Sequence, residues 1–332
     1  MTSSSSSSSA FALDSFSYGK SLVRLLRVVR DPSNPKKQDV IEYTVQSLLT
    51  GPTLDTSYTE GDNTLVVPTD TQKNTIHYFA KTLDGPSVLC PEKFALELGN
   101  HFVKRYDHVT KCTIDVIAQK WSRIELDDGP HPHAFVRDGD EKRTVFVQTE
   151  KARVNGQDAV VCTQLKGGMK DLLVLKSSGS AFHSFWRDEF TTLKAVNDRI
   201  FSTSVECQYN FALPTGSLSE YLSSPTLPDF NAISSCVRKH TLRVFATHES
   251  ASVQATLYLM CTEILGDAPT TDALVDVGYA LPNKHYVPIN LDWAKLDNLT
   301  ETTAEVFHPQ ADPSGLIKAV VKRTGDGGAP KL

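Results

Sequence analysis

Two polar segments early in the chain could serve proton transfer or anion binding. Lys20 follows Tyr18-Gly19 at the start of an extended segment, and a lysine in such a place can act as a base if burial favours its neutral amine. Pro68-Thr69-Asp70 stands where a strand is expected to turn into a helix. Unpaired backbone N–H groups at a helix start suit an anionic or carbonyl ligand. A solvated lysine and a simple helix cap are the alternative interpretations.

Two later pairs of side chains carry planar hydrogen-bonding groups. Arg199 and Gln254 can each form two hydrogen bonds with one partner, although their distance in the sequence does not by itself place them in one site. Asn283 and His285 stand two residues apart, so in an extended segment their side chains face the same way. A structural histidine beside a turn is the alternative for His285.

The chain lacks common signatures of cofactor sites. It has no GxGxxG after a strand, no GxxxxGK[ST] and no HExxH. His131 and His133 form an HxH pair without a matched carboxylate or cysteine, which is a weak indication of a metal. The six cysteines contain no CxxC pair and are expected to be free thiols in a reducing compartment. The sequence therefore predicts neither a cofactor nor a metal.

Length and composition are those of an ordinary globular protein. The 332 residues exceed what one hydrophobic core usually spans, so two domains are expected. A net charge of −5 without a long basic run disfavours a nucleic-acid partner. No apolar stretch reaches the length of a bilayer span, so no membrane contact is predicted.

The elements expected in the first half are strands, two helices and further strands. Extended segments are predicted at residues 18–30, 39–49, 112–118, 144–154 and 157–163. The arginine spacing in the first of them also fits a helix. One helix is expected to start with Thr69 or Asp70 as its N-cap, and another at Pro91. Asn155-Gly156 predicts a tight hairpin turn, because its residues readily adopt positive φ angles.

The second half repeats this order. Strands are predicted at residues 172–177, 200–211, 274–281 and 317–322, and helices at 188–199, after an N-cap at Asp229, and at 253–266. The halves meet near residue 155. The repetition predicts an α+β architecture of two tandem domains, at residues 16–154 and 155–323.

Both ends of the chain are expected to be tails. Residues 1–15 include a run of serines and are predicted to be disordered. Residues 324–332 are predicted to be a flexible tail, and they end in Pro330-Lys331-Leu332. This tripeptide resembles the Ser-Lys-Leu peroxisomal address, which predicts a peroxisomal location and binding to the import receptor. A chance match of three residues is the alternative.

Several segments together have a distinctive wording. The longest reads Leu172-Leu173-Val174-Leu175-Lys176-Ser177-Ser178-Gly179-Ser180-Ala181-Phe182 and continues through Phe185, Phe190 and Leu193 to Arg199. The others are Tyr18-Gly19-Lys20 with Val23-Arg24, residues 67–76, Pro130-His131-Pro132-His133, residues 250–256 and residues 281–286. Together, and in their order along the chain, these segments closely resemble those of the urate oxidase (uricase) family, from about residue 16 to the C-terminus.

The resemblance implies a fold and an assembly. Urate oxidases have two tandem tunnelling-fold (T-fold) domains, with antiparallel sheets and helices layered on one face. Four subunits surround a central tunnel, and the active sites lie at subunit interfaces. This chain is accordingly expected to form a homotetramer.

The resemblance also implies a reaction and residue roles. Urate is oxidised by O₂ and water to 5-hydroxyisourate and H₂O₂, without metal or flavin. Phe182 would stack on the purine ring, and Arg199 with Gln254 would hold its edge. The resemblance also assigns Val253 a backbone contact with the substrate, and it assigns Thr69 and the Asp70 N–H a contact from the neighbouring subunit. Lys20 and Thr69 would form a proton relay that His285 extends. Asn283 would bind O₂ or water.

Two other readings remain open at this point. A non-redox pterin or purine enzyme of the same fold, such as a cyclohydrolase or an aldolase, would also clamp a flat heterocycle, usually with an acidic anchor. The pair Arg199 and Gln254 suits the carbonyl-rich edge of urate better. An inactive descendant is the third reading. The joint retention of Lys20, Thr69, Asn283 and His285 argues against it.

Overall fold

Eight antiparallel strands form one sheet in the computed structural model, which describes residues 11–268 and 270–324. Each strand pairs with the strands before and after it in the sequence. The strands are β1 (Tyr18–Arg30), β2 (Gln38–Thr50), β3 (Lys111–Leu126), β4 (Gly129–Val154), β5 (Gln157–Lys176), β6 (Phe201–Phe211), β7 (Leu274–Pro288) and β8 (Phe307–Lys322). Strands 18–30, 39–49 and 200–211 are thus confirmed to within a residue or two.

The helices interrupt the sheet in two places. Those between β2 and β3 are α1 (Thr56–Thr59), α2 (Thr69–Thr82), α3 (Gly85–Val88) and α4 (Pro91–Arg105), after a 3₁₀ turn at Pro52–Leu54. Those between β6 and β7 are α5 (Leu218–Leu222), α6 (Phe230–Thr247) and α7 (Val253–Gly266), and a second 3₁₀ turn, Asp292–Ala294, follows β7. Each half therefore reads strand, strand, helices, strand, strand, as the sequence predicts.

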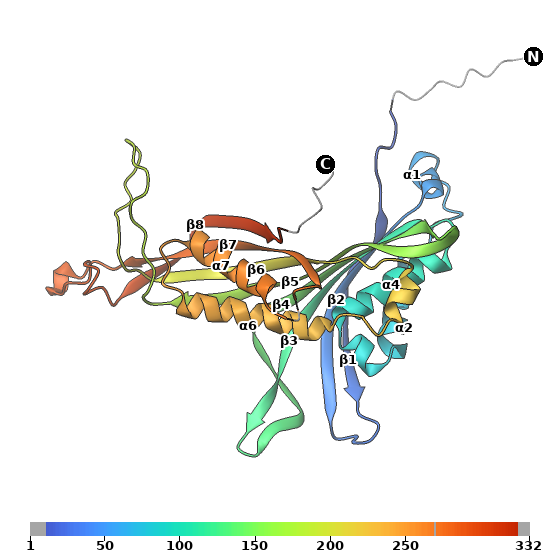
Figure 1. The fold of residues 1–332 in the computed structure, drawn as a ribbon, viewed down its shortest axis with the longest axis horizontal. Coiled ribbons are helices and arrows are strands. Elements are labelled where there is room, and N and C mark those ends of the chain that lie inside the picture. The colour runs from blue at the N-terminus through green and yellow to red at the C-terminus, as the bar shows by residue number, and fades with distance from the viewer. Residues whose placement is uncertain (1–10, 269, 325–332) are drawn as a thin grey trace, which may run out of the picture.

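The long helices cover one face of the sheet (Figure 1). α2 packs on β1 and α4 on β3 and β4, while α6 packs on β5 and α7 on β7 and β8. Along β2, buried residues alternate with half-buried ones, as expected for a strand with helices on one side only. α4 buries Phe94, Leu98 and Phe102 completely, because residues four apart share one face of a helix. The α+β class and its one-sided helical layer are thus confirmed.

The hairpin at the middle of the chain joins the two halves without a break in the sheet. Asn155 and Gly156 have φ angles of 51° and 81°, which confirms the predicted tight turn between β4 and β5. β4 and β5 pair from Val154 and Gln157 down to Lys142 and Lys170. Hydrogen-bonded pairing thus joins the two halves along β4 and β5, and no separation marks residue 155. The domain boundary there stays a prediction.

A buried arginine fastens the helices of the two halves together. Arg143 on β4 donates to both carboxylate oxygens of Glu92 on α4, at 2.6 and 3.2 Å. It also donates to the Phe230 carbonyl oxygen and the Asn231 side-chain oxygen at the start of α6, at 2.9 and 2.7 Å. Glu92 is fully buried, so its charge depends on Arg143 for compensation.

One predicted helix is absent. Residues 188–199 form no helix and belong to the long connection between β5 and β6. The Asp188 side chain accepts from the backbone N–H of Phe190 at 3.0 Å, a local bond that competes with helix formation. Further along, Val196 exchanges two backbone hydrogen bonds with Phe182. Leu193, on the same connection, is half exposed.

Three other boundaries differ from the predictions. The N-cap of α2 is Pro68, whose ψ of 142° is extended, so Thr69 and Asp70 are already the first residues of the helix and neither caps it. The strands predicted at 157–163 and 172–177 are one strand, β5, with a register shift between Met169 and Leu172. The strands predicted at 112–118, 144–154, 274–281 and 317–322 are parts of the longer β3, β4, β7 and β8.

The remaining predictions concern cysteines, tails and membranes. All six cysteines are free and buried, as predicted. Residues 11–17 have no regular structure, whereas the serine run at residues 3–9 and Pro330-Lys331-Leu332 lie outside the described residues. Within the described ranges, no helix is long and apolar enough to cross a membrane.

Candidate functional site

The structure divides the predicted site residues into two groups. The helix-start group is on β1 and α2 and comprises Lys20, Thr69 and Asp70. The clamp group is on the connection between β5 and β6, on α7 and on β7, and comprises Phe182, Arg199, Val253, Gln254, Asn283 and His285. β1 and β7 are six steps apart in the sheet, which at about 4.8 Å a step amounts to roughly 29 Å. Figure 1 shows α2 at one end of the molecule and the β5–β6 connection towards the other. One chain therefore does not bring the two groups together.

In the helix-start group, the start of α2 lies open beside Lys20. Pro68, at the N-cap, makes no side-chain hydrogen bond to the first turn, so the backbone N–H groups there point outward without a cap. Thr69 and Asp70 are exposed. The hydrogen bond from Lys73 and its charge lower the pKa of Asp70, and the charge of Lys20 contributes as well. Lys20 is thus close enough to α2 to act on the first turn electrostatically.

Close packing of β1 on β2 positions Lys20. A Cβ on Gly19 would lie 1.8 Å from the Ser47 carbonyl oxygen, so only glycine allows the strands to approach here. Lys20 pairs with Ser47, and a register shift follows before Val23. Leu22, within this shift, has a φ of 55°. The sequence Tyr18-Gly19-Lys20 therefore precedes a local bend near the start of β1.

Buried polar contacts tie α2 to the same strands. The Ser47 hydroxyl donates to the Gln72 side-chain oxygen at 2.9 Å, and Gln72 donates to the Val67 carbonyl oxygen at 3.4 Å. The Val67 N–H donates to the Tyr18 hydroxyl at 2.9 Å. Ser47 and Gln72 are fully buried. Sequence reasoning missed both, although a glutamine on the apolar face of an amphipathic helix is a usable signal.

In the clamp group, Arg199 lies over an aromatic ring. Its guanidinium carbon is 5.1 Å from the centroid of Phe182, within the range of a cation–π contact. Phe182 stacks on Phe185 with centroids 4.9 Å apart and an angle of 13° between the planes. Burial lowers the pKa of Arg199 from its ordinary value. The pair offers a flat apolar face next to a partly desolvated fork of N–H donors.

Backbone pairing joins this pair to the start of α7. Arg199 N–H donates to the Ser180 carbonyl oxygen at 2.9 Å, and Ala181 N–H donates to that of Ser250 at 2.8 Å. Ser252 is the N-cap of α7, and its hydroxyl accepts from Ala255 N–H at 3.2 Å. Val253, which is buried, and Gln254, which is exposed, are the first two residues of the helix. The clamp thus has a helix start as one wall.

Two buried polar side-chain atoms lie on the strands β6 and β7, in and opposite the clamp group. Asn283 on β7 pairs with Thr203 on β6, so the two side chains project from the same face of the sheet. The Asn283 Oδ1 and Thr203 Oγ1 atoms are buried and have no hydrogen-bond partner among the described residues. Such atoms favour a polar ligand. Thr203 was not predicted, since a threonine inside a strand gives no signal of its own.

His285 lies further along β7. It pairs with Gln310, and the pairing of β7 with β8 is irregular between Asn283 and His285. That the two side chains face the same way therefore stays a prediction. His131 and His133 lie on the β3–β4 hairpin, with ring centroids 4.6 Å apart. His133 Nδ1 is 3.0 Å from the Lys36 carbonyl oxygen.

Comparison with known proteins gives a consistent result. The uricase family model matches residues 16–148 and 165–318, one segment in each half. The uricase of Schizosaccharomyces pombe is 44% identical over 92% of this chain and 96% of its own length, and that of Aspergillus flavus is 42% identical over 92% and 95%. The crystal structure of the uricase from Arthrobacter globiformis superposes with a TM-score of 0.79 at 32% identity, covering 97% of this chain and 98% of that one.

Proposed function

Since this chain belongs to the uricase family, with its tandem T-fold architecture, we propose that it oxidises urate. Urate, O₂ and water give 5-hydroxyisourate and H₂O₂. Two electrons pass from the conjugated urate anion to O₂, and water supplies the hydroxyl group. Because the substrate is itself the reductant, the protein needs only to bind, deprotonate and shield it. We propose that no cofactor takes part.

The clamp group is suited to hold the purine. Phe182 offers an aromatic ring for stacking, and the Arg199 guanidinium carbon lies 5.1 Å from the centroid of this ring. Arg199 would donate to the carbonyl-rich edge of urate, and Gln254 would donate to it or accept from its N–H groups, with a backbone contact from Val253 at the start of α7. The unpaired Oδ1 of Asn283 supports a role for this residue beside O₂ or water above the ring. Thr203 lies opposite it and would help to fix its orientation.

The helix-start group is suited to move protons. Lys20 and Thr69 would form the relay that takes a proton from urate, and the Asp70 N–H at the open start of α2 would bind its anionic edge. A general base of this kind contributes about 10²–10⁴ in rate. His285, on β7 with Asn283, would extend the relay from the other side.

The observation that carries the proposal of a site shared by two subunits is the separation of the helix-start group from the clamp group by six strand steps. A complete site therefore requires the helix-start group of one subunit and the clamp group of another. A closed ring of such head-to-tail contacts is a symmetric oligomer, and we propose the homotetramer. Exposed Trp186, Phe190 and Trp293 on the connections beyond β5 and β7 support burial of these connections by a second copy.

Mixed oligomers test the shared site. Lys20→Met and Arg199→Gln chains are each expected to be inactive in urate consumption and peroxide release. Refolded together from denaturant in equal amounts, they should regain about a quarter of wild-type activity, because random pairing gives a quarter of sites two intact groups. A mixture of Lys20→Met and Thr69→Ala, both in the helix-start group, is the matched control and should regain none. Recovery in neither mixture would contradict the interface site.

The activity itself is tested with metal-stripped protein and urate in air. Loss of urate with equal formation of H₂O₂ is the expected result. Absence of both would overturn the oxidase. Because the family model and the relatives named above are uricases, a cyclohydrolase- or aldolase-like reaction gains no support.

The location is a separate proposal. Pro330-Lys331-Leu332 would bind the peroxisomal import receptor as a C-terminal address. A fluorescent protein that ends in residues 324–332 should enter peroxisomes, whereas the same fusion with Lys331→Glu should not. Diffuse fluorescence from both fusions would contradict the proposal.

A further inference from the structure

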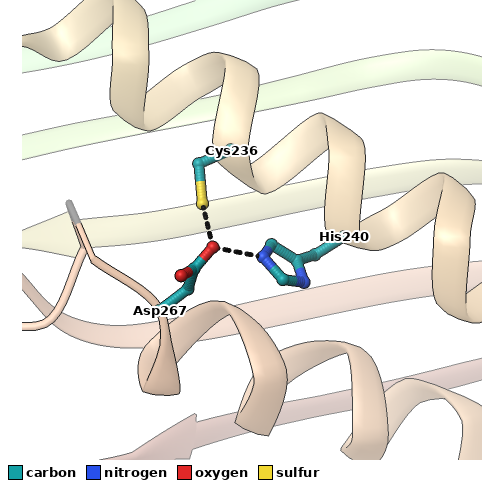
Figure 2. A group of neighbouring side chains, drawn as sticks. All are labelled: Cys236, His240 and Asp267. Atoms are coloured by element: carbon teal, nitrogen blue, oxygen red, sulfur yellow. Dashed lines mark hydrogen bonds and ion pairs between the residues drawn. The ribbon is translucent and has the colours of Figure 1, made fainter.

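A compact group of possible metal ligands lies in the helical layer, between α6 and the C-terminal end of α7, whereas the proposed site uses the N-terminal end of α7. Cys236 and His240 are one turn apart on α6, and Asp267 follows the last residue of α7. One ligand atom from each, the Cys236 Sγ, a His240 ring nitrogen and an Asp267 carboxylate oxygen, lies within 4.8 Å of the others. Figure 2 shows the three side chains converging between the two helices. Spacing of i and i+4 places two ligands on one helix face.

The present contacts within this group are hydrogen bonds to one oxygen. His240 Nε2 is 2.7 Å from Asp267 Oδ2, and Cys236 Sγ is 3.5 Å from the same oxygen. Cys236 and His240 are buried, whereas the Asp267 side chain is 44% exposed. The group is therefore fixed on its protein side and open to solvent on the other, as a metal with a bound water requires.

We propose that Cys236, His240 and Asp267 bind a thiophilic divalent cation of the zinc type. Thiolate, imidazole and carboxylate form the mixed ligand set that Zn²⁺ accepts in four-coordinate sites. Calcium and magnesium prefer oxygen ligands only. Three protein ligands leave the fourth position to water.

The surroundings of His240 fit this role. Its Nδ1 is 3.4 Å from Glu263 Oε2 and 3.1 Å from Arg243 Nη2. Arginine can only donate, so without metal Nδ1 accepts from Arg243 and Nε2–H donates to Asp267. When Nε2 binds the cation, the ring proton is on Nδ1 instead of Nε2. Nδ1–H then donates a hydrogen bond to Glu263. A carboxylate behind the histidine is common at zinc sites and strengthens the ligand.

Positive charges nearby limit the affinity. Arg243 pairs with Glu263, and the charge of Lys239 acts on both Cys236 and Asp267. Both side chains repel a bound metal cation. The cation binds the thiolate of Cys236, so the thiol proton leaves when the ion binds.

Cobalt substitution of the full-length, metal-stripped protein tests the site. One equivalent of Co²⁺ per chain should produce a thiolate-to-metal charge-transfer band, and Zn²⁺ should abolish it. Cys236→Ser should lose the band, and Asp267→Asn or His240→Asn should weaken Zn²⁺ binding at least about tenfold. Asp272→Asn, an exposed acid five residues further on, is the matched control and should bind like wild type.

A second measurement covers variants that fold poorly. Zn²⁺ should raise the Tm of the wild type and of Asp272→Asn but not that of Cys236→Ala, because a ligand stabilises only the state it binds. No charge-transfer band in the wild type, or the same band in Cys236→Ser, would overturn the proposal. So would an equal Tm shift in all variants, which would indicate adventitious binding elsewhere.

Discussion

The starts of α2 and α7 are comparable places in the two halves, since each ends a polar loop beside the sheet, but they are built differently. At α2, Pro68 leaves the first turn uncapped and Thr69 exposed. At α7, the Ser252 hydroxyl caps the helix, Val253 is buried, and the β5–β6 connection pairs with Ser250 just before the helix. The first helix start is open, whereas the second is partly covered by its own chain. Under the proposed function, the first would move protons and the second would hold the substrate.

The largest expected effect comes from the open end. Lys20→Met should lower kcat by about 10²–10⁴, with little change in KM, because a general base acts mainly in the transition state. Steady-state rates of peroxide formation give both constants. Lys81→Met, an exposed lysine of α2, is the matched control and should leave them unchanged. A near-normal kcat in Lys20→Met would remove Lys20 from the relay.

The next effect comes from the partly covered end. Arg199→Lys keeps the charge but loses the planar fork, so kcat/KM for urate should fall about 10- to 100-fold, equivalent to about 1.5–3 kcal/mol. Arg187→Lys is a close control, since Arg187 lies 4.6 Å from the centroid of Phe185 on the same connection. If both variants lost activity equally, the aromatic contact rather than substrate binding would explain the result.

A smaller effect should follow from the bend that positions Lys20. Gly19→Ala places a Cβ 1.8 Å from the Ser47 carbonyl oxygen, and relieving this overlap should cost about 1–3 kcal/mol of unfolding free energy. Activity should fall with it, since Lys20 is the next residue. Gly266→Ala meets no atom within 4 Å and should be neutral. Urea unfolding of the two variants, followed by circular dichroism, would measure the difference, and equal stabilities would contradict the close approach.

The smallest effect tests the cap of α7. Ser252→Ala should lose about 1 kcal/mol of unfolding free energy and raise KM modestly, because Val253 and Gln254 follow the cap directly. Ser217→Ala removes the corresponding bond in the capping box of α5 and should lose similar stability with no change in KM. An unchanged KM in both would separate the α7 start from substrate binding.

Local signals predicted most elements and failed where tertiary contacts decide. Asn155-Gly156 fixed a turn through its φ angles, and Pro91 marked the start of α4 through its missing N–H. Residues 188–199 have helical spacing, yet the pairing of Val196 with Phe182 and the turn at Asp188 hold them in a connection. Hydrophobic periodicity registers neither contact, because it reports only which residues would share a helix face.

The site residues also divide into those that the sequence predicted and those that it did not. Those carried by the family resemblance lie in two groups that agree with a site shared by two subunits, and their roles remain predictions. Ser47 and Thr203 escaped prediction because a polar side chain inside a strand gives no signal of its burial, whereas Gln72 could have been found from its place on the apolar face of α2. Their importance depends on what lies opposite them in the folded chain.

The Arg143 contact with Glu92 and the start of α6 has a consequence for how the chain comes apart. If the second half opened alone, Arg143 would stay paired with Glu92 in the first half but would lose its hydrogen bonds to Phe230 and Asn231, at a cost of about 1–3 kcal/mol. The pairing of β4 with β5, from Val154 and Gln157 to Lys142 and Lys170, adds to this coupling. The two repeats are therefore expected to melt in a single cooperative transition, with no half-unfolded intermediate populated at equilibrium.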